Sequence, residues 1–99
     1  MIDRRSVIAR QHAALLDAAS VLDDLAAGIT PTRARVNAAA LALRARIRFS
    51  PPSFDILPAS IHLNMFVRRE SLDPDKDWQS RAPKFAEAVR KVAARMMHP

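Results

Sequence analysis

The chain has 99 residues and 49% hydrophobic composition, which predicts one globular domain spanning 1–99 and excludes a disordered protein. Alanine supplies much of the apolar fraction, so we expect a thin core that self-association or a partner completes. The absence of cysteine excludes disulfides, thiolate nucleophiles, zinc fingers and iron–sulfur clusters, whereas the net charge of +6 is compatible with anionic partners.

The first predicted element is a helix over Asp3–Ala27. A narrow, largely apolar stripe recurs at alternating spacings of four and three residues, which is typical of a helical bundle. This stripe comprises Ile8, Gln11, Leu15, Ala18, Leu22 and Leu25, and Ile29 continues it. Gly28, the one glycine of the chain, follows where a left-handed C-terminal cap is favoured.

A second helix is predicted directly afterwards, with Thr30 as its cap and Pro31 in its first turn. The short connection predicts an antiparallel helical hairpin, in which Asp23 and Asp24 contact Arg33 or Arg35. This helix is apolar on two faces. One face comprises Val36, Ala40, Leu43 and Ile47, and the other comprises Ala38, Leu41, Ala45 and Phe49. Two apolar faces are typical of a helix packed on both sides, so the second face is expected to bind a partner.

The middle of the chain, Ser50–Pro58, is predicted to be irregular because Pro51, Pro52 and Pro58 remove backbone donors and restrict their neighbours. The apolar side chains in this segment are Phe54, Ile56 and Leu57. Two interpretations remain open for them. Either they cover one end of the hairpin core, or they form a docking loop for a partner.

The next stretch, Ser60–Arg68, alternates apolar residues with others, and this pattern favours a strand. A strand needs a partner, which is either Arg46–Ser50 or the same segment of a second copy. We predict a short helix or an extended connector instead, and a short β element over 60–68 remains the alternative.

A last amphipathic helix is predicted to run to about Met97, with Asp73 as its cap and Pro74 in its first turn. Its apolar stripe comprises Trp78, Ala82, Phe85, Val89, Val92 and Met96. Pro83 implies a start near Ser80, which places Trp78 in the preceding turn. The expected fold is therefore mainly α: an antiparallel hairpin, an irregular proline-containing middle and a C-terminal helix packed across them.

No residue pattern indicates catalysis. One glycine cannot form a phosphate-binding loop, and the three histidines, His12, His62 and His98, lie far apart without metal-ligand spacing. Asp23 and Asp24 would point about 100° apart on a helix, so they do not converge on one substrate. We therefore predict no enzyme activity, cofactor, metal or small-molecule ligand.

The leading functional hypothesis is a non-enzymatic protein–protein interaction or assembly module that completes its core through a protein partner or a homo-oligomer. The predicted partner-binding residues are Leu41, Phe49, Phe54 and Ile56. No membrane partner is predicted, because the chain has neither a spanning apolar run nor an apolar signal core over Met1–Arg10. A cytoplasmic location is expected on that basis.

The alternative hypothesis is a basic accessory subunit that binds DNA or RNA non-specifically through phosphates. The residues expected to contact phosphates are Arg33, Arg44, Arg48, Lys84, Arg90, Lys91 and Arg95. The aromatic side chains mostly occupy apolar stripes, so base stacking is not expected. An arginine and alanine bias can also arise from coding composition alone.

Overall fold

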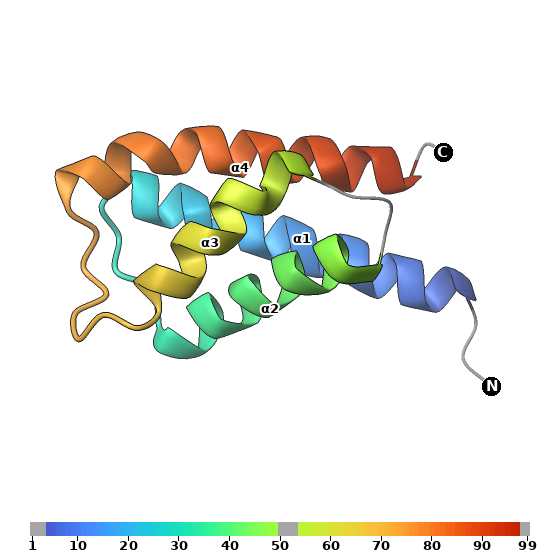
Figure 1. The fold of residues 1–99 in the computed structure, drawn as a ribbon, viewed down its shortest axis with the longest axis horizontal. Coiled ribbons are helices and arrows are strands. Elements are labelled where there is room, and N and C mark those ends of the chain that lie inside the picture. Colours follow the sequence, from blue (N-terminus) through green and yellow to red (C-terminus); the bar gives the residue numbers. More distant parts are fainter. Residues whose placement is uncertain (1–3, 50–53, 98–99) are drawn as a thin grey trace.

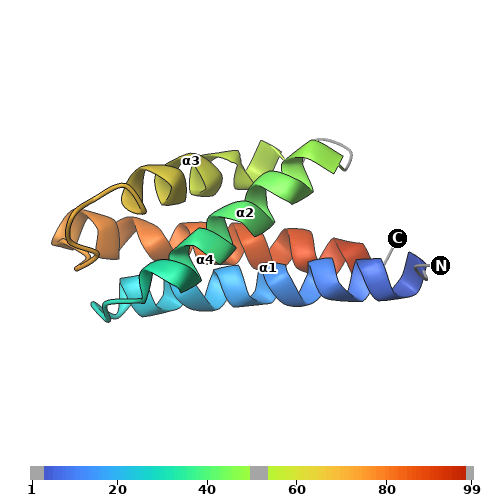
Figure 2. The ribbon, with the colours of Figure 1, turned by 90° about the horizontal axis from the view of Figure 1, so that it is seen from below.

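The computed structural model describes residues 4–49 and 54–97. Within these ranges the chain forms four α-helices and one short 3₁₀ turn and contains no strand, which confirms the mainly α fold. The elements are α1 (Arg4–Ala26), α2 (Arg33–Phe49), η1 (Phe54–Ile56), α3 (Leu57–Phe66) and α4 (Lys76–Met97). The long helices α1 and α4 lie antiparallel and side by side (Figure 1). The helices α2 and α3 cover one side of this pair (Figure 2).

The turn from α1 to α2 begins with the cap that the sequence predicts. Gly28 adopts a φ of 77°, which is the left-handed region. Its N–H donates to the Leu25 carbonyl at 3.1 Å, and the Ile29 N–H donates to the Asp24 carbonyl at 2.8 Å. This pair of bonds is the Schellman arrangement, and it ends α1. The hairpin that follows is held by the predicted ion pair between Asp24 and Arg35, at 2.8 Å.

The start of α2 differs from the prediction. Thr32 caps the helix, because its Oγ1 accepts a hydrogen bond from the Arg35 N–H at 3.2 Å. Pro31 therefore precedes the helix, where it is buried, instead of occupying the first turn. Thr30 is directed elsewhere, and its hydroxyl donates to the Asp73 carboxylate in the α3–α4 connection.

The middle of the chain is more regular than expected. The short helix preferred for 60–68 is confirmed as α3, and the alternative of a strand is wrong. The buried residues of α3 recur at helical spacing, which stabilises a helix against the core despite the alternating pattern. They are Ala59, Ser60, Leu63 and Phe66. Pro58 lies in the first turn of α3, where its missing donor costs no hydrogen bond. Pro51 and Pro52 lie outside the described residues.

The last helix is longer than predicted. It begins at Lys76, and the Trp78 N–H donates to Asp75 Oδ1 at 2.8 Å, so Asp75 is the cap and not Asp73. Trp78 therefore belongs to the first turn of α4. Pro83 lies inside the helix and is exposed, so the helix does not begin near Ser80.

The core forms where the predicted stripes of α1, α2 and α4 meet. Its largest fully buried side chains are Leu15, Val21, Leu22, Leu25, Val36, Leu43, Ile56, Leu63, Phe66, Val89 and Val92. Next to this core, the His62 ring stacks on Phe85 with 5.0 Å between centroids and meets Trp78 edge-on at 5.5 Å. These rings join α3 to α4 and thereby hold α3 in position over the bundle.

Candidate functional site

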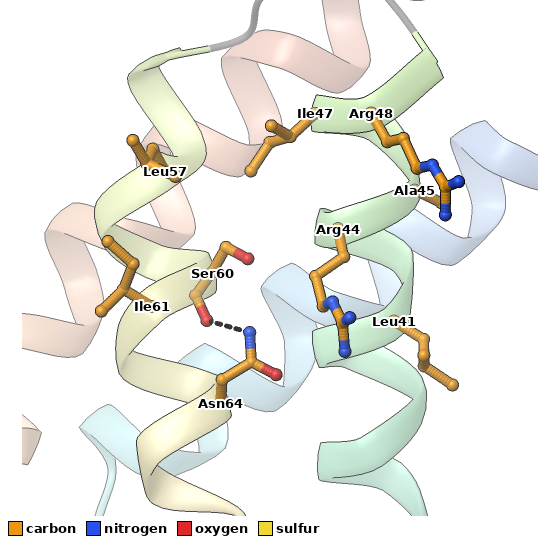
Figure 3. A pocket seen from close by; sticks show the side chains of 9 residues that line it. All are labelled: Leu41, Arg44, Ala45, Ile47, Arg48, Leu57, Ser60, Ile61 and Asn64. Carbon is orange, nitrogen blue, oxygen red and sulfur yellow. Dashed lines mark hydrogen bonds between the residues drawn. The ribbon is translucent and has the colours of Figure 1, made fainter.

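A groove lies between α2 and α3, with a volume of about 490 Å³. From α2 it is lined by Leu41, Arg44, Ala45, Ile47 and Arg48. From α3 it is lined by Leu57, Ser60, Ile61 and Asn64 (Figure 3). We call this feature the α2–α3 groove.

Short side chains leave the groove open. Figure 3 shows Ile47 projecting from α2 towards α3, and Ser60 and Asn64 on the side of α3 that faces α2. Asn64 Nδ2 donates to the Ser60 carbonyl at 2.9 Å, so this amide is bonded within its own helix and does not bridge to α2. Ala45 and Ser60 are the smallest of the lining residues, and Ile47 is the large apolar side chain that extends from α2 towards α3.

Three large apolar side chains that line the groove are exposed to solvent. Leu41 is 62% exposed, Ile61 is 49% exposed and Leu57 is 39% exposed. Met65, which lies one turn beyond Ile61 on the same face of α3, is also exposed. A cluster of exposed apolar side chains costs solubility in a monomer and is typical of an interaction surface.

The charge of the groove has one sign. Arg44 and Arg48 are its only charged lining residues. The helix α2 carries five arginines and no carboxylate, and α3 carries no Asp, Glu, Lys or Arg. Arg44 is exposed and makes no hydrogen bond or ion pair with any other described residue, whereas Arg48 does interact within the chain. The groove is therefore an apolar surface with a cationic border.

The structure separates Leu41 from Ile56, two of the four residues that were predicted to bind a partner. Leu41 lines the groove, whereas Ile56 is 0% exposed in the core, where its side chain is not accessible to a partner. Ile56 ends η1 and packs inwards, whereas the next residue, Leu57, faces the groove. The side chains of Phe49 and Phe54 lie outside the described part of the structure.

Sequence reasoning missed Leu57 and Ile61 as groove residues. Their spacing of four, continued by Met65, is a signal for one helical face. The alternation over 60–68 obscured this signal, because the same residues also fit a strand pattern.

The residues expected to contact phosphates do not form one surface. Those on α2 and those on α4 are separated, because no Cα atom of α2 comes within 8 Å of a Cα atom of α4 in the described structure. Arg33 donates to the Val67, Arg69 and Glu70 carbonyls and so anchors the end of α3. On α4, Lys91 pairs with Glu87 at 3.2 Å and Arg95 pairs with Asp55 at 3.1 Å, and Lys84 lies beside both pairs.

Arg90, on α4, has a raised pKa. Its guanidinium donates two hydrogen bonds to the Asp23 carboxylate of α1, and these bonds raise the pKa of Arg90. Arg90 therefore joins α4 to α1 and is already paired with a carboxylate. Such pairing reduces the positive potential that this part of α4 presents to an anion.

Neither a metal site nor a membrane-spanning helix occurs among the described residues, 4–49 and 54–97. No group of three or more His, Cys, Asp or Glu side chains is placed to hold a metal ion. No helix in these ranges combines the length and the apolar character needed to cross a membrane. Comparisons with models of protein families, with curated proteins and with solved structures identify no match.

Proposed function

We propose that this protein is a non-enzymatic protein-interaction module and that the α2–α3 groove is its binding surface. The proposal rests on one observation, the clustering of exposed Leu41, Leu57 and Ile61 around a groove of about 490 Å³. Burial of apolar area contributes about 25 cal/mol per Å², so covering these side chains would stabilise a complex. The location of the protein in the cytoplasm stays a prediction.

A groove between two helices is suited to one mode of peptide recognition. In this mode an amphipathic helix places its apolar face into the groove, with anchors at helical spacing. Such anchors would contact Leu57 and Ile61 on the α3 side of the groove and Leu41 on the α2 side. The small residues Ala45 and Ser60 leave room for the inserted side chains.

The test is selection of helical peptides from a display library, followed by NMR mapping of the selected peptides on the protein. We expect the selected peptides to shift the amide resonances of groove residues. Leu41→Ala combined with Ile61→Ala should weaken their binding roughly tenfold or more, because each truncation removes about 1–3 kcal/mol of apolar burial. The matched control is Leu16→Ala, an exposed leucine of α1 outside the groove. The proposal would be overturned if both variants lost the same affinity for the peptides, or if the peptides mapped to another surface.

Phosphate binding to DNA or RNA is the second proposal, and its support is weaker. At least four of the seven residues expected to contact phosphates already bind groups of the chain, namely Arg33, Arg90, Lys91 and Arg95. A salt titration with duplex DNA separates the two proposals. Phosphate binding would weaken steeply as salt rises, with a slope of about −0.9 per neutralised phosphate in a logarithmic plot.

A further inference from the structure

We infer that the occupant of the α2–α3 groove is an acidic amphipathic helix of a different protein, and not a second copy of this chain. The inference rests on the proposed function and names the chemistry of the partner. It follows from three properties of the groove: its length, the sign of its charge and the position of Arg44.

The length of the groove sets the length of the occupant. The wall formed by α3 contains 10 residues, which corresponds to about 15 Å at 1.5 Å per residue. A helix laid along this wall contacts it over about three turns. It can therefore present apolar anchors at positions i, i+4 and i+7 or i+8, which matches the exposed stripe of Leu57, Ile61 and Met65.

The charge of the groove selects an anionic occupant. Both charged lining residues are arginines, and Arg44 makes no ion pair with any carboxylate of the described residues. A partner helix with Glu or Asp beside its apolar stripe would place anionic groups next to Arg44. A helix with Lys or Arg at the same positions would place like charges together, which disfavours binding.

Arg44 is positioned to bind such a carboxylate. It lies one turn from Leu41 on α2, and in Figure 3 its side chain runs along the edge of α2 that borders the groove. Its guanidinium has five donors in a planar fork that matches a carboxylate. No other described residue uses these donors, so binding a partner would not require an existing ion pair to break.

The same charges argue against pairing of two copies through the groove. A two-fold interface brings the same surface of both copies together. Here it would juxtapose two pairs of arginines, Arg44 and Arg48 from each copy, and no carboxylate from α2 or α3. The apolar gain of such a dimer would be opposed by like-charge repulsion.

The experiment uses three synthetic helical peptides with one apolar stripe and different flanking residues: all Glu, all Gln or all Lys. These three residues have similar helix propensities, so the peptides differ mainly in charge. Titration calorimetry measures the affinities, and NMR mapping locates the peptides. We expect the Glu peptide to bind roughly tenfold tighter than the Gln peptide, the Lys peptide to bind weakest, and these differences to shrink as salt rises.

A single substitution assigns the preference to Arg44. Arg44→Gln should remove most of the preference for the Glu peptide and leave the affinity for the Gln peptide nearly unchanged. The control is Arg81→Gln, which removes an exposed arginine of α4 that pairs with Asp77 outside the groove. Loss of the preference in the control variant would show a general effect of net charge and would overturn the inference.

The outcomes separate the inference from the proposed function. If the Glu and Gln peptides bound in the groove with equal affinity, the inference of an acidic partner would be overturned, whereas the groove would remain a binding site. Failure of all three peptides to map to the groove would overturn both. Sedimentation that reveals a dimer, abolished by Leu41→Ala with Ile61→Ala, would assign the groove to a second copy. If anionic lipid vesicles shifted the resonances of groove residues more strongly than the Glu peptide does, the inference of a protein partner would likewise be overturned.

Discussion

The ring of Phe66 in α3 stacks on the indole of Trp78 in α4, with 4.9 Å between the centroids and 16° between the planes. Both side chains are nearly fully buried, and the guanidinium carbon of Arg69 lies 5.2 Å from the centre of the Phe66 ring. Stacked pairs of this kind contribute about 0.5–1.5 kcal/mol beyond their apolar burial. The contact fixes the end of α3 and therefore the position of one wall of the groove.

Phe66→Leu should reduce the free energy of unfolding by about 1–3 kcal/mol, because it removes the stack and leaves unfilled volume. Urea denaturation followed by the fluorescence of Trp78, the one tryptophan of the chain, measures this change. The neighbouring variant Met65→Leu alters an exposed side chain and should change stability by less than about 0.5 kcal/mol. Equal effects of the two variants would contradict a structural role for the stack.

Gly28→Ala should destabilise the protein by about 1–2 kcal/mol, because any L residue at a φ of 77° strains the backbone. The added methyl group would meet Gln79 Nε2 at 3.4 Å, which is an ordinary contact, so the cost arises from the backbone and not from a clash. Gly28→Asn should lose less stability than Gly28→Ala, since asparagine tolerates this conformation. Thermal unfolding of the three proteins should rank them in the order Gly, Asn, Ala; any other order would contradict the assignment.

Asp75→Ala should destabilise α4 by about 1 kcal/mol, because the Asp75 carboxylate caps the helix through the Trp78 N–H. Hydrogen exchange should be faster for the amides of the first turn of α4 in this variant. Asp73→Ala serves as the comparison, because the Asp73 carboxylate binds the side chains of Thr30 and Ser71 and caps no helix. If Asp73→Ala accelerated hydrogen exchange in the first turn of α4 more than Asp75→Ala does, the assignment of Asp75 as the cap would be wrong.

The pair of Asp23 and Arg90 should couple weakly. Both side chains are about half exposed, so a double-mutant cycle with Asp23→Ala and Arg90→Ala should yield at most about 1 kcal/mol. Because the hydrogen bonds to the Asp23 carboxylate raise the pKa of Arg90, the arginine contribution is present at neutral pH, where both groups are charged. It is lost as the pH rises through the pKa of Arg90.

Two measurements check this pair. The coupling energy should stay constant between about pH 6 and pH 9, where Arg90 remains charged, and it should decrease as salt screens the charges. A coupling that grew with salt would indicate packing of the side chains and not an ion pair. The same cycle on Lys91 and Glu87, which are one turn apart on α4, offers a reference for an exposed helical pair.

Local features of the chain account for most of the correct predictions. The helical spacing of Leu15, Leu22 and Leu25 predicts α1 and its buried face, because this periodicity is set within the helix itself. Gly28 predicts the end of α1 for a similar reason, since a left-handed conformation depends on the residue that adopts it. The contact between Asp24 and Arg35 follows from the short hairpin between their helices.

Packing between distant segments determines the features that were predicted wrongly or missed. The stretch 60–68 fits a strand and a helix equally well until Leu63 and Phe66 are buried against the bundle, which only a helix allows here. Adjacent Ile56 and Leu57 are both apolar, and the path of η1 into α3 decides that Ile56 enters the core and Leu57 borders the groove. Leu41 was predictable as an exposed apolar residue of α2. The groove itself requires α3 to lie beside α2, and this arrangement depends on long-range burial that no local pattern encodes.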